Sequence, residues 1–157
     1  MENRLNIHVQ GQAAMRSLYG MSTYLSKSQL EENLLHLIYF RVSQVNGCAF
    51  CLDMHSKDLL EAGDTAQRLF LLDAWREAPF YTDRERAALA WAEAVTRIAG
   101  GNVPDDVYAE CITQFTEAEL IDLTIAVLAI NSYNRINIAF PANNVGSYMP
   151  GMYAKAK

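Results

Sequence analysis

Two cysteines and a histidine lie within eight residues of one another, in the segment Cys48-Ala-Phe-Cys51-Leu-Asp-Met-His55. On an α-helix, which turns about 100° per residue, their three side chains project into a sector of about 60°. Cys51 and His55 are four residues apart, so their side chains can touch on a helix. Thiolate is the reactive form of cysteine, and imidazole accepts protons near neutral pH. The spacing therefore indicates a redox-active dithiol with its own base.

Two considerations disagree about which thiol reacts first. The free N–H groups and the dipole at a helix N-terminus favour a thiolate at Cys48. The contact with His55 one turn later favours a thiolate at Cys51 instead. These residues alone leave both assignments open.

The elements that must position these side chains are predicted to be helical throughout. Capping boxes or close relatives of them occur at four places: Ser28-x-x-Glu31, Asp64-x-x-Gln67, Thr82-x-x-Glu85 and Thr116-x-x-Glu119. We expect about seven helices, near 10–25, 29–46, 49–62, 65–75, 83–99, 104–114 and 117–140. No segment shows sustained alternation of apolar and polar residues, so no sheet is expected. The fold class predicted is all-α.

A tight helical hairpin is predicted immediately before the dithiol. Asn46-Gly47 is a helix-ending pair, because both residues tolerate the left-handed conformation that such an end requires. At 1.5 Å per residue, His55 lies about 10 Å and His36 about 16 Å from the bend, on antiparallel helices. With helix axes about 8–10 Å apart, the two imidazoles can approach directly or through one water.

Composition indicates one globular domain over residues 1–157 and excludes some partners. The net charge is −5 and the basic residues form no cluster, which argues against nucleic acid or an anionic membrane as partner. The most apolar segment, 120–130, is too short to span a bilayer. Three cysteines without a secretory signal fit a reducing compartment, so we expect a cytoplasmic protein.

The last segment, residues 141–157, changes character. Pro141, Gly146, Pro150 and Gly151 do not continue a helix. Exposing the tyrosine and methionine side chains of this segment to water is nevertheless unfavourable. We predict an extended arm that packs across a neighbouring subunit, with a disordered tail as the alternative.

The sequence also predicts the environments of two further side chains. Arg41 falls within the apolar arc of its helix, so it should pair with a buried acid or with a neighbouring subunit. Cys111 has no histidine near it in sequence, and we expect an ordinary, semi-buried thiol.

Two other interpretations of the cysteine motif are possible. Cys48, Cys51, His55 and His36 would together make a Cys₂His₂ zinc set. A non-catalytic role as an oligomeric scaffold or partner-binding domain is a second alternative.

The segment from Arg41 to Asp58 resembles the core signature of the AhpD-like alkylhydroperoxidases, in the carboxymuconolactone decarboxylase superfamily. Ser-Gln-x-Asn-Gly followed by C-x-x-C-x-x-x-H carries most of this resemblance. The stretches 75–81, 84–93 and 131–140 also resemble members of that family. The similarity spans about residues 20–140.

The resemblance implies an all-helical fold that assembles as homotrimers or homohexamers, with the active site beneath neighbouring subunits. It also implies reduction of hydrogen peroxide or organic hydroperoxides without a cofactor or a metal. In that chemistry Cys51 attacks the peroxide, Cys48 resolves the oxidised sulfur and His55 is the base. An external dithiol or a thioredoxin-like protein would then restore the thiols. Decarboxylation is disfavoured, since the relatives that catalyse it do not use a cysteine pair.

The chain departs from the family pattern at the proton relay. His36 stands where members of the family usually carry a glutamate, twelve residues before the first cysteine. A neutral imidazole passes protons but supplies no permanent negative charge. Glu32, one turn earlier, is a candidate substitute. Phe50 stands where the founding enzymes carry a histidine, which removes a second polar group.

Overall fold

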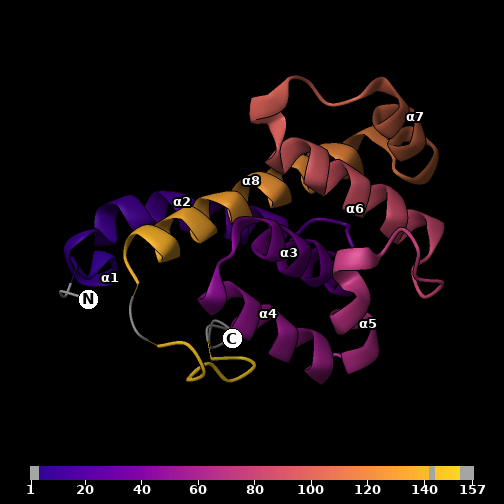
Figure 1. Cartoon of the computed structure of the whole chain (residues 1–157). Helices are drawn as coiled ribbons and strands as arrows, with labels where there is room; N and C mark the ends of the chain where they lie inside the picture. The colour runs from indigo at the N-terminus through magenta and orange to yellow at the C-terminus, as the bar shows by residue number, and fades with distance from the viewer. Residues whose placement is uncertain (1–3, 142–143, 153–157) are drawn as a thin grey trace.

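The computed structural model describes residues 4–141 and 144–152, which form eight α-helices, two short 3₁₀ helices and no strand. The all-α prediction is confirmed (Figure 1). The helices are α1 (Ile7–Gln10), α2 (Gln12–Leu25), α3 (Glu32–Asn46), α4 (Ala49–Glu61), α5 (Ala66–Leu71), η1 (Leu72–Ala74), α6 (Asp83–Thr96), η2 (Ile98–Gly100), α7 (Asp105–Gln114) and α8 (Glu117–Ala139). Within the described ranges, no helix has both the length and the apolar character needed to cross a bilayer.

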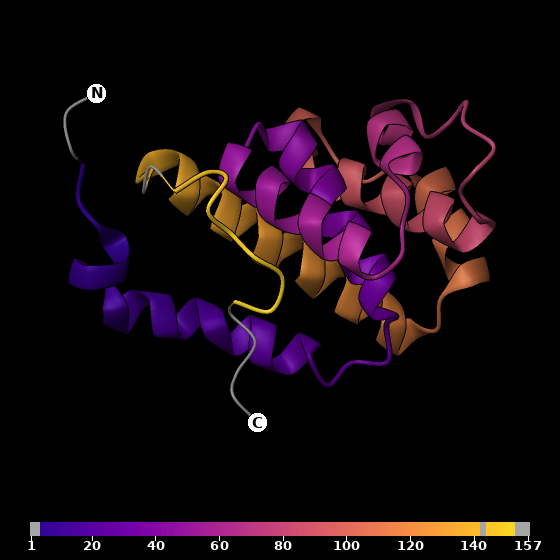
Figure 2. The same ribbon diagram turned by 90° about the horizontal axis from the view of Figure 1, so that it is seen from below.

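Helix α3 is the centre of the fold. It packs against α4, α8 and α6, while α2 lies along α8 and α7 lies against α6. Figures 1 and 2 show α4 and α2 on different sides of this central pair of α3 and α8. The larger of two hydrophobic clusters contains Leu37, Ile38 and Val42 of α3, all fully buried, and the smaller one joins α2 to α8. The helix that precedes the dithiol is therefore held on several sides.

Two of the predicted capping boxes are complete. Thr82 accepts a hydrogen bond from the Glu85 amide, and the Glu85 carboxylate accepts one from the Thr82 amide. Thr116 and Glu119 make the same reciprocal pair at the start of α8. Each box satisfies amide groups that the first helical turn leaves without an intrahelical partner.

The other two boxes were predicted wrongly. Helix α3 begins after Glu31 with no side-chain cap, and the Ser28 hydroxyl instead donates to a carbonyl in the preceding turn. At α5 the capping side chain is Thr65, one residue later than expected. Asp64 forms an ion pair with Arg68 (2.8 Å) and accepts a hydrogen bond from the Thr65 amide. In both cases a competing local hydrogen bond takes the predicted cap away from the helix.

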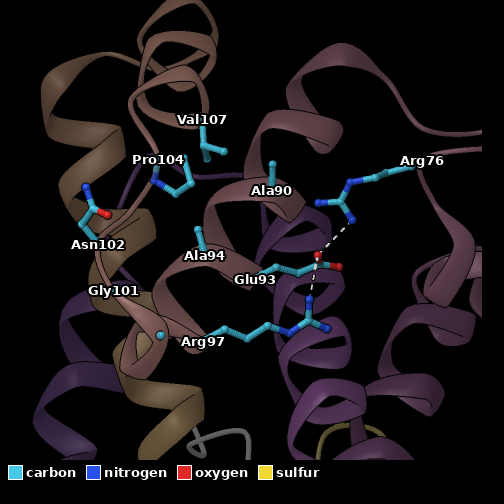
Figure 3. Close-up of a pocket in the computed structure, with 10 residues that line it drawn as sticks. Arg76, Ala90, Glu93, Ala94, Arg97, Gly101, Asn102, Pro104 and Val107 are labelled. Carbon is cyan, nitrogen blue, oxygen red and sulfur yellow. Dashed lines mark hydrogen bonds and ion pairs between the residues drawn. The ribbon is translucent and has the colours of Figure 1, made fainter.

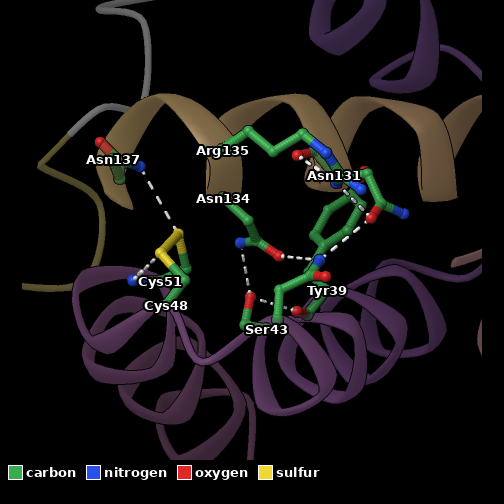
Figure 4. The surroundings of a disulfide bond; sticks show 9 residues. Tyr39, Ser43, Cys48, Cys51, Asn131, Asn134, Arg135 and Asn137 are labelled. Carbon is green, nitrogen blue, oxygen red and sulfur yellow. Dashed lines mark hydrogen bonds between the residues drawn. A yellow bond between two sulfur atoms is a disulfide. The ribbon is translucent and has the colours of Figure 1, made fainter. Parts of the chain in front are cut away.

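The tight hairpin between α3 and α4 is present. Gly47 adopts the left-handed conformation (φ 70°) and ends α3, and Cys48 is already the N-cap of α4. The Asn46 side chain, at the bend, donates to Asn131 (3.0 Å) and Asn134 (2.9 Å) of α8. Asn134 in turn donates to Ser43 (3.0 Å; Figure 4). These side-chain amides hold the bend, and with it the dithiol, against α8.

Arg41 pairs with a buried acid, as expected from its place in the apolar arc. Its Nε atom donates to Glu93 of α6 (2.7 Å), which also accepts from Trp75 (2.9 Å) and Arg76 (2.9 Å). Burial by itself raises the pKa of Glu93, but the hydrogen bonds from Trp75, Arg41 and Arg76 outweigh it and lower the pKa. Glu93 is therefore an ionised carboxylate inside the core.

The described part of the C-terminal arm, residues 144–152, packs on α4 of its own chain. The Lys57 ammonium donates to the carbonyls of Gly146 (3.2 Å) and Tyr148 (3.0 Å), and the Gly146 amide donates to Asp53 (2.9 Å). Tyr148 is 6% exposed, and its hydroxyl donates to Asp58 (2.7 Å). The predicted contact with a neighbouring subunit remains a prediction, and residues 142–143 and 153–157 lie outside the described ranges.

Candidate active site

The two sulfurs of the motif are joined by a disulfide across the first turn of α4 (Figure 4). The Cα atoms of Cys48 and Cys51 are 5.4 Å apart, and both residues are 1% exposed. As the N-cap, Cys48 accepts a hydrogen bond from the Cys51 amide through its sulfur (3.4 Å). The helical spacing thus brings the sulfurs within bonding reach.

Asn137 of α8 provides a polar contact to the second cysteine. Its side-chain amide donates to the Cys51 sulfur (3.5 Å; Figure 4). A hydrogen-bond donor at this position favours the thiolate over the thiol once the disulfide is reduced. Sequence reasoning missed Asn137, because its contact with Cys51 depends on how α8 lies against α4.

His55 is buried beside two other rings. Its ring centroid lies 5.7 Å from that of His36 and 5.1 Å from that of Tyr39. Burial, and then the charge of His36, lowers the pKa of His55 to about 3. His55 is consequently neutral at physiological pH, and the same burial makes its ring a weaker base than a free imidazole, so a nearby negative charge is needed to favour its protonated form.

The hairpin brings the two predicted histidines together. The Nδ1 atoms of His36 and His55 are 3.5 Å apart, so of the two arrangements that the helix geometry allowed, the rings adopt the direct approach. Glu32 lies 3.9 Å from His36, but its side chain is 89% exposed. An exposed carboxylate is screened by water, so Glu32 is a weak substitute for the family's relay glutamate.

A carboxylate that sequence reasoning missed lies between the histidines. Asp58 Oδ2 is 3.8 Å from the Nδ1 atom of His36 and 3.8 Å from the Nδ1 atom of His55. Its other oxygen accepts the Tyr148 hydroxyl at 2.7 Å. The three-residue spacing from His55 was a usable signal, since residues i and i+3 are neighbours on a helix. Asp58 thus supplies the negative charge that His36 does not.

The structure brings together a set of possible metal ligands that differs from the alternative Cys₂His₂ set. In the part of the chain that the structure describes, His36, His55 and Asp58 form a cluster whose ligand atoms lie within 4.8 Å of one another. Neither cysteine belongs to this cluster, and the two sulfurs are bonded to each other. The structure therefore does not assemble the Cys₂His₂ zinc set considered from the sequence.

A separate cavity of about 330 Å³ lies between α6 and the start of α7 (Figure 3). Its charged wall consists of Glu93 with Arg76 and Arg97, both of which form ion pairs with that carboxylate. None of the four predicted site residues lines this cavity. Its charged groups belong to the structural cluster around Glu93.

Known proteins resemble this chain over most of its length. The sequence profile of the Carboxymuconolactone decarboxylase family matches residues 10–94. The uncharacterized protein YdfG of Bacillus subtilis is 39% identical over 139 residues, which are 88% of this chain and 95% of that protein.

Solved structures share the fold. A protein of unknown function from Agrobacterium tumefaciens, described as an AhpD-type antioxidant defence protein, is 39% identical, with a TM-score of 0.85. The match covers 90% of this chain and 97% of that one. The AhpD core of a peroxidase-related protein from Ralstonia eutropha is 17% identical, with a TM-score of 0.73 and coverage of 86% and 72%. At that identity the likeness concerns the fold alone. The profile match and the two relatives at 39% identity show that this chain belongs to the carboxymuconolactone decarboxylase family, among its AhpD-like members.

Proposed function

We propose that this protein is a thiol-dependent peroxidase that reduces hydrogen peroxide or organic hydroperoxides. The observation that carries the proposal is the Cys48–Cys51 pair, in bonding reach at the start of a helix whose next turn presents a buried, neutral His55. The relative from Agrobacterium tumefaciens, a protein of unknown function described as a candidate antioxidant defence protein, supports such a role. The same arrangement argues against an inert scaffold, because a scaffold needs neither a dithiol nor a base.

The first step uses the reduced protein. Cys51 gives its proton to His55, and the thiolate sulfur attacks one peroxide oxygen. A sulfur–oxygen bond forms as the oxygen–oxygen bond breaks, and the departing alkoxide takes the proton from His55. Cys51 is oxidised to a sulfenic acid, and the peroxide is reduced to an alcohol, or to water when the substrate is hydrogen peroxide.

The second step closes the disulfide. The Cys48 sulfur attacks the Cys51 sulfenic acid, a sulfur–sulfur bond forms, and hydroxide leaves as water with the proton from Cys48. An external dithiol then reduces the disulfide by thiol–disulfide exchange and is itself oxidised. One turnover therefore consumes one peroxide and one external dithiol.

A lowered thiol pKa alone does not explain such an enzyme. A reduction of about two units from 8.5 raises the thiolate fraction at neutral pH more than tenfold. The same reduction weakens the nucleophile about eightfold, if the slope for disulfide exchange applies. The net gain is only a few-fold. A positioned proton donor for the leaving oxygen is worth far more, about 10²–10⁴-fold, and the proposal assigns that role to His55.

The proposal is tested with the reduced protein and one equivalent of cumene hydroperoxide. We expect one peroxide to be consumed per chain, with loss of two thiols and formation of the Cys48–Cys51 disulfide, read by mass spectrometry of peptides. Cys111 should remain a thiol, because burial, followed by the charge of Glu110, raises its pKa to about 12. Persistence of hydroperoxide in the presence of two titratable thiols would refute the proposal.

Asp58 is proposed as a positioning residue that stabilises the protonated form of His55. Replacing it by asparagine keeps the shape and removes the charge 3.8 Å from both imidazoles. A charged interaction of about 1.5 kcal/mol corresponds to a tenfold effect. We expect kcat/KM for the hydroperoxide to fall about tenfold in Asp58→Asn, while the two thiols remain titratable.

The matched control for that variant is Glu61→Gln, which removes the same charge from an exposed position on the same helix. It should leave kcat/KM unchanged. Equal kcat/KM values for Asp58→Asn and Glu61→Gln would show that Asp58 has no part in the mechanism.

The partners of the reaction are also proposals. The reductant is an external dithiol or a thioredoxin-like protein, and the chain works as a homotrimer or homohexamer in the cytoplasm. Sedimentation velocity of the full chain measures the oligomer directly, and steady-state turnover with dithiothreitol or with thioredoxin and its reductase compares the two donors.

A further inference from the structure

Three ligand atoms from α3 and α4 converge on one point. The separations are 3.5 Å between the two Nδ1 atoms and 3.8 Å from each of them to Asp58 Oδ2. All three distances are longer than a typical hydrogen bond, which spans about 2.7–3.2 Å. The point equidistant from the three atoms lies about 2.1 Å from each, as calculated from those separations. Zinc lies about 2.0–2.2 Å from nitrogen and oxygen ligands.

We propose that the side chains of His36, His55 and Asp58 bind a divalent transition-metal ion, with zinc as the ion tested first. Two imidazoles and one carboxylate form a ligand set that suits such an ion and leaves a fourth position open. This set differs from one built on the cysteines, because it uses no sulfur.

The surroundings suit a cation. The side chains of His36, His55 and Asp58 are 21%, 7% and 12% exposed, so water screens a charge there only in part. With neutral imidazoles, the only formal charge of the three ligands is the negative one on Asp58. An ion with two positive charges therefore meets an opposite charge at close range, in a partly desolvated place.

The carboxylate is also oriented for this role. The Tyr148 hydroxyl donates to Asp58 Oδ1, which leaves Oδ2 directed at the two imidazoles. Outer hydrogen bonds of this kind fix ligands in metal sites. Tetrahedral zinc lies out of the plane of its three protein ligands, with ligand atoms about 3.3 Å apart. From the present separations of 3.5 and 3.8 Å, that geometry requires the ligand atoms to come closer together by about 0.2–0.5 Å.

The effect of a bound metal ion on activity rests on the proposed function, whereas metal binding itself does not. A metal ion that holds His36, His55 and Asp58 occupies the groups that assist proton transfer. The loaded protein should then reduce hydroperoxide more slowly than the metal-free protein, although its dithiol is intact.

Binding is tested in the Cys48→Ser/Cys51→Ser double variant, so that thiols cannot contribute. We expect titration calorimetry with zinc to give one ion per chain, and cobalt(II) to give visible bands without a sulfur-to-cobalt charge-transfer band. In the same background, His36→Gln and Asp58→Asn should each weaken binding more than tenfold. His8→Gln, on the exposed α1 helix, should leave it unchanged.

Two results would overturn the proposal: no zinc binding by the folded double variant, or binding that neither His36→Gln nor Asp58→Asn weakens. Far-UV circular dichroism establishes that each variant is folded. Peroxidase assays on the cysteine-containing protein, with and without zinc, are scored separately. A protein that binds zinc and has no peroxidase activity would contradict the proposed function alone, and an active peroxidase that binds no zinc would contradict the metal site alone.

Discussion

Replacing Cys51 by serine is expected to abolish hydroperoxide turnover. A serine hydroxyl is not ionised at neutral pH and cannot supply the nucleophile that a thiolate supplies. Cys48→Ser should behave differently, because the attacking sulfur remains while the resolving sulfur is gone. We expect that variant to consume one hydroperoxide per chain and then stop as the Cys51 sulfenic acid.

The measurement is a stopped-flow assay of hydroperoxide loss, followed by trapping of sulfenic acid with dimedone and mapping of the labelled peptide. Cys111→Ser is the matched control and should turn over like the parent, since that thiol is buried and donates a hydrogen bond to the Ala87 carbonyl. A single turnover by Cys51→Ser together with none by Cys48→Ser would reverse the two roles. That reversal would favour the helix N-terminus over His55 as the feature that activates the thiol.

Replacing Glu93 by glutamine is expected to cause the largest loss of stability. The Glu93 carboxylate accepts hydrogen bonds from Arg41, Trp75 and Arg76, and Arg41 is 4% exposed. Glutamine leaves the Arg41 charge in the core without its buried counter-ion. Breaking a buried pair from one side costs about 3–5 kcal/mol. We expect the free energy of unfolding in urea to fall by that amount.

The matched control for this variant is Asp73→Asn. Asp73 also pairs with Arg41 (2.5 Å), but its side chain is 81% exposed. An exposed pair contributes about 0–1 kcal/mol, so this variant should change the free energy of unfolding only slightly. Equal losses of unfolding free energy in Glu93→Gln and Asp73→Asn would show that burial of the ion pair does not determine its contribution to stability.

The same carboxylate predicts a dependence of stability on pH. The pKa of Glu93 in the folded protein lies below its ordinary value of 4.5, so the unfolded chain takes up the proton first as the pH falls. The stabilisation is fully present above that ordinary value and is lost as the pH falls through the folded-state pKa. Urea unfolding between pH 3 and 7 should therefore show a smaller acid-dependent loss for Glu93→Gln than for the parent.

The parts of the site that depend on one or two adjacent helices could be predicted from the sequence. Helical periodicity placed the cysteines of the motif on the same wall, and the tolerance of Gly47 for a left-handed conformation placed the hairpin. From that hairpin the approach of His36 to His55 followed by arithmetic, because the register of two short-connected antiparallel helices leaves little freedom. Local geometry was sufficient in these cases.

The parts that depend on distant segments could not be predicted. Asp58 has the appearance of a solvated helix residue until α3 and the C-terminal arm cover it. Asn137 meets the Cys51 sulfur only because of how α8 crosses α4, which no local pattern specifies. The cap at Ser28 failed for a different, local reason, since the carbonyl three residues earlier took the same hydroxyl. Predicting such contacts requires the packing itself.

The Tyr148–Asp58 hydrogen bond has a consequence for biosynthesis. The two residues are 90 positions apart, and translation proceeds at about 5–20 residues per second. Cys48 and Cys51 therefore exist for about 5–20 seconds before the tyrosine that orders the nearby carboxylate has been made. During that interval a nascent chain carries its thiols without the Tyr148–Asp58 hydrogen bond, so the fully ordered carboxylate beside His36 and His55 forms only after the C-terminal arm has been made.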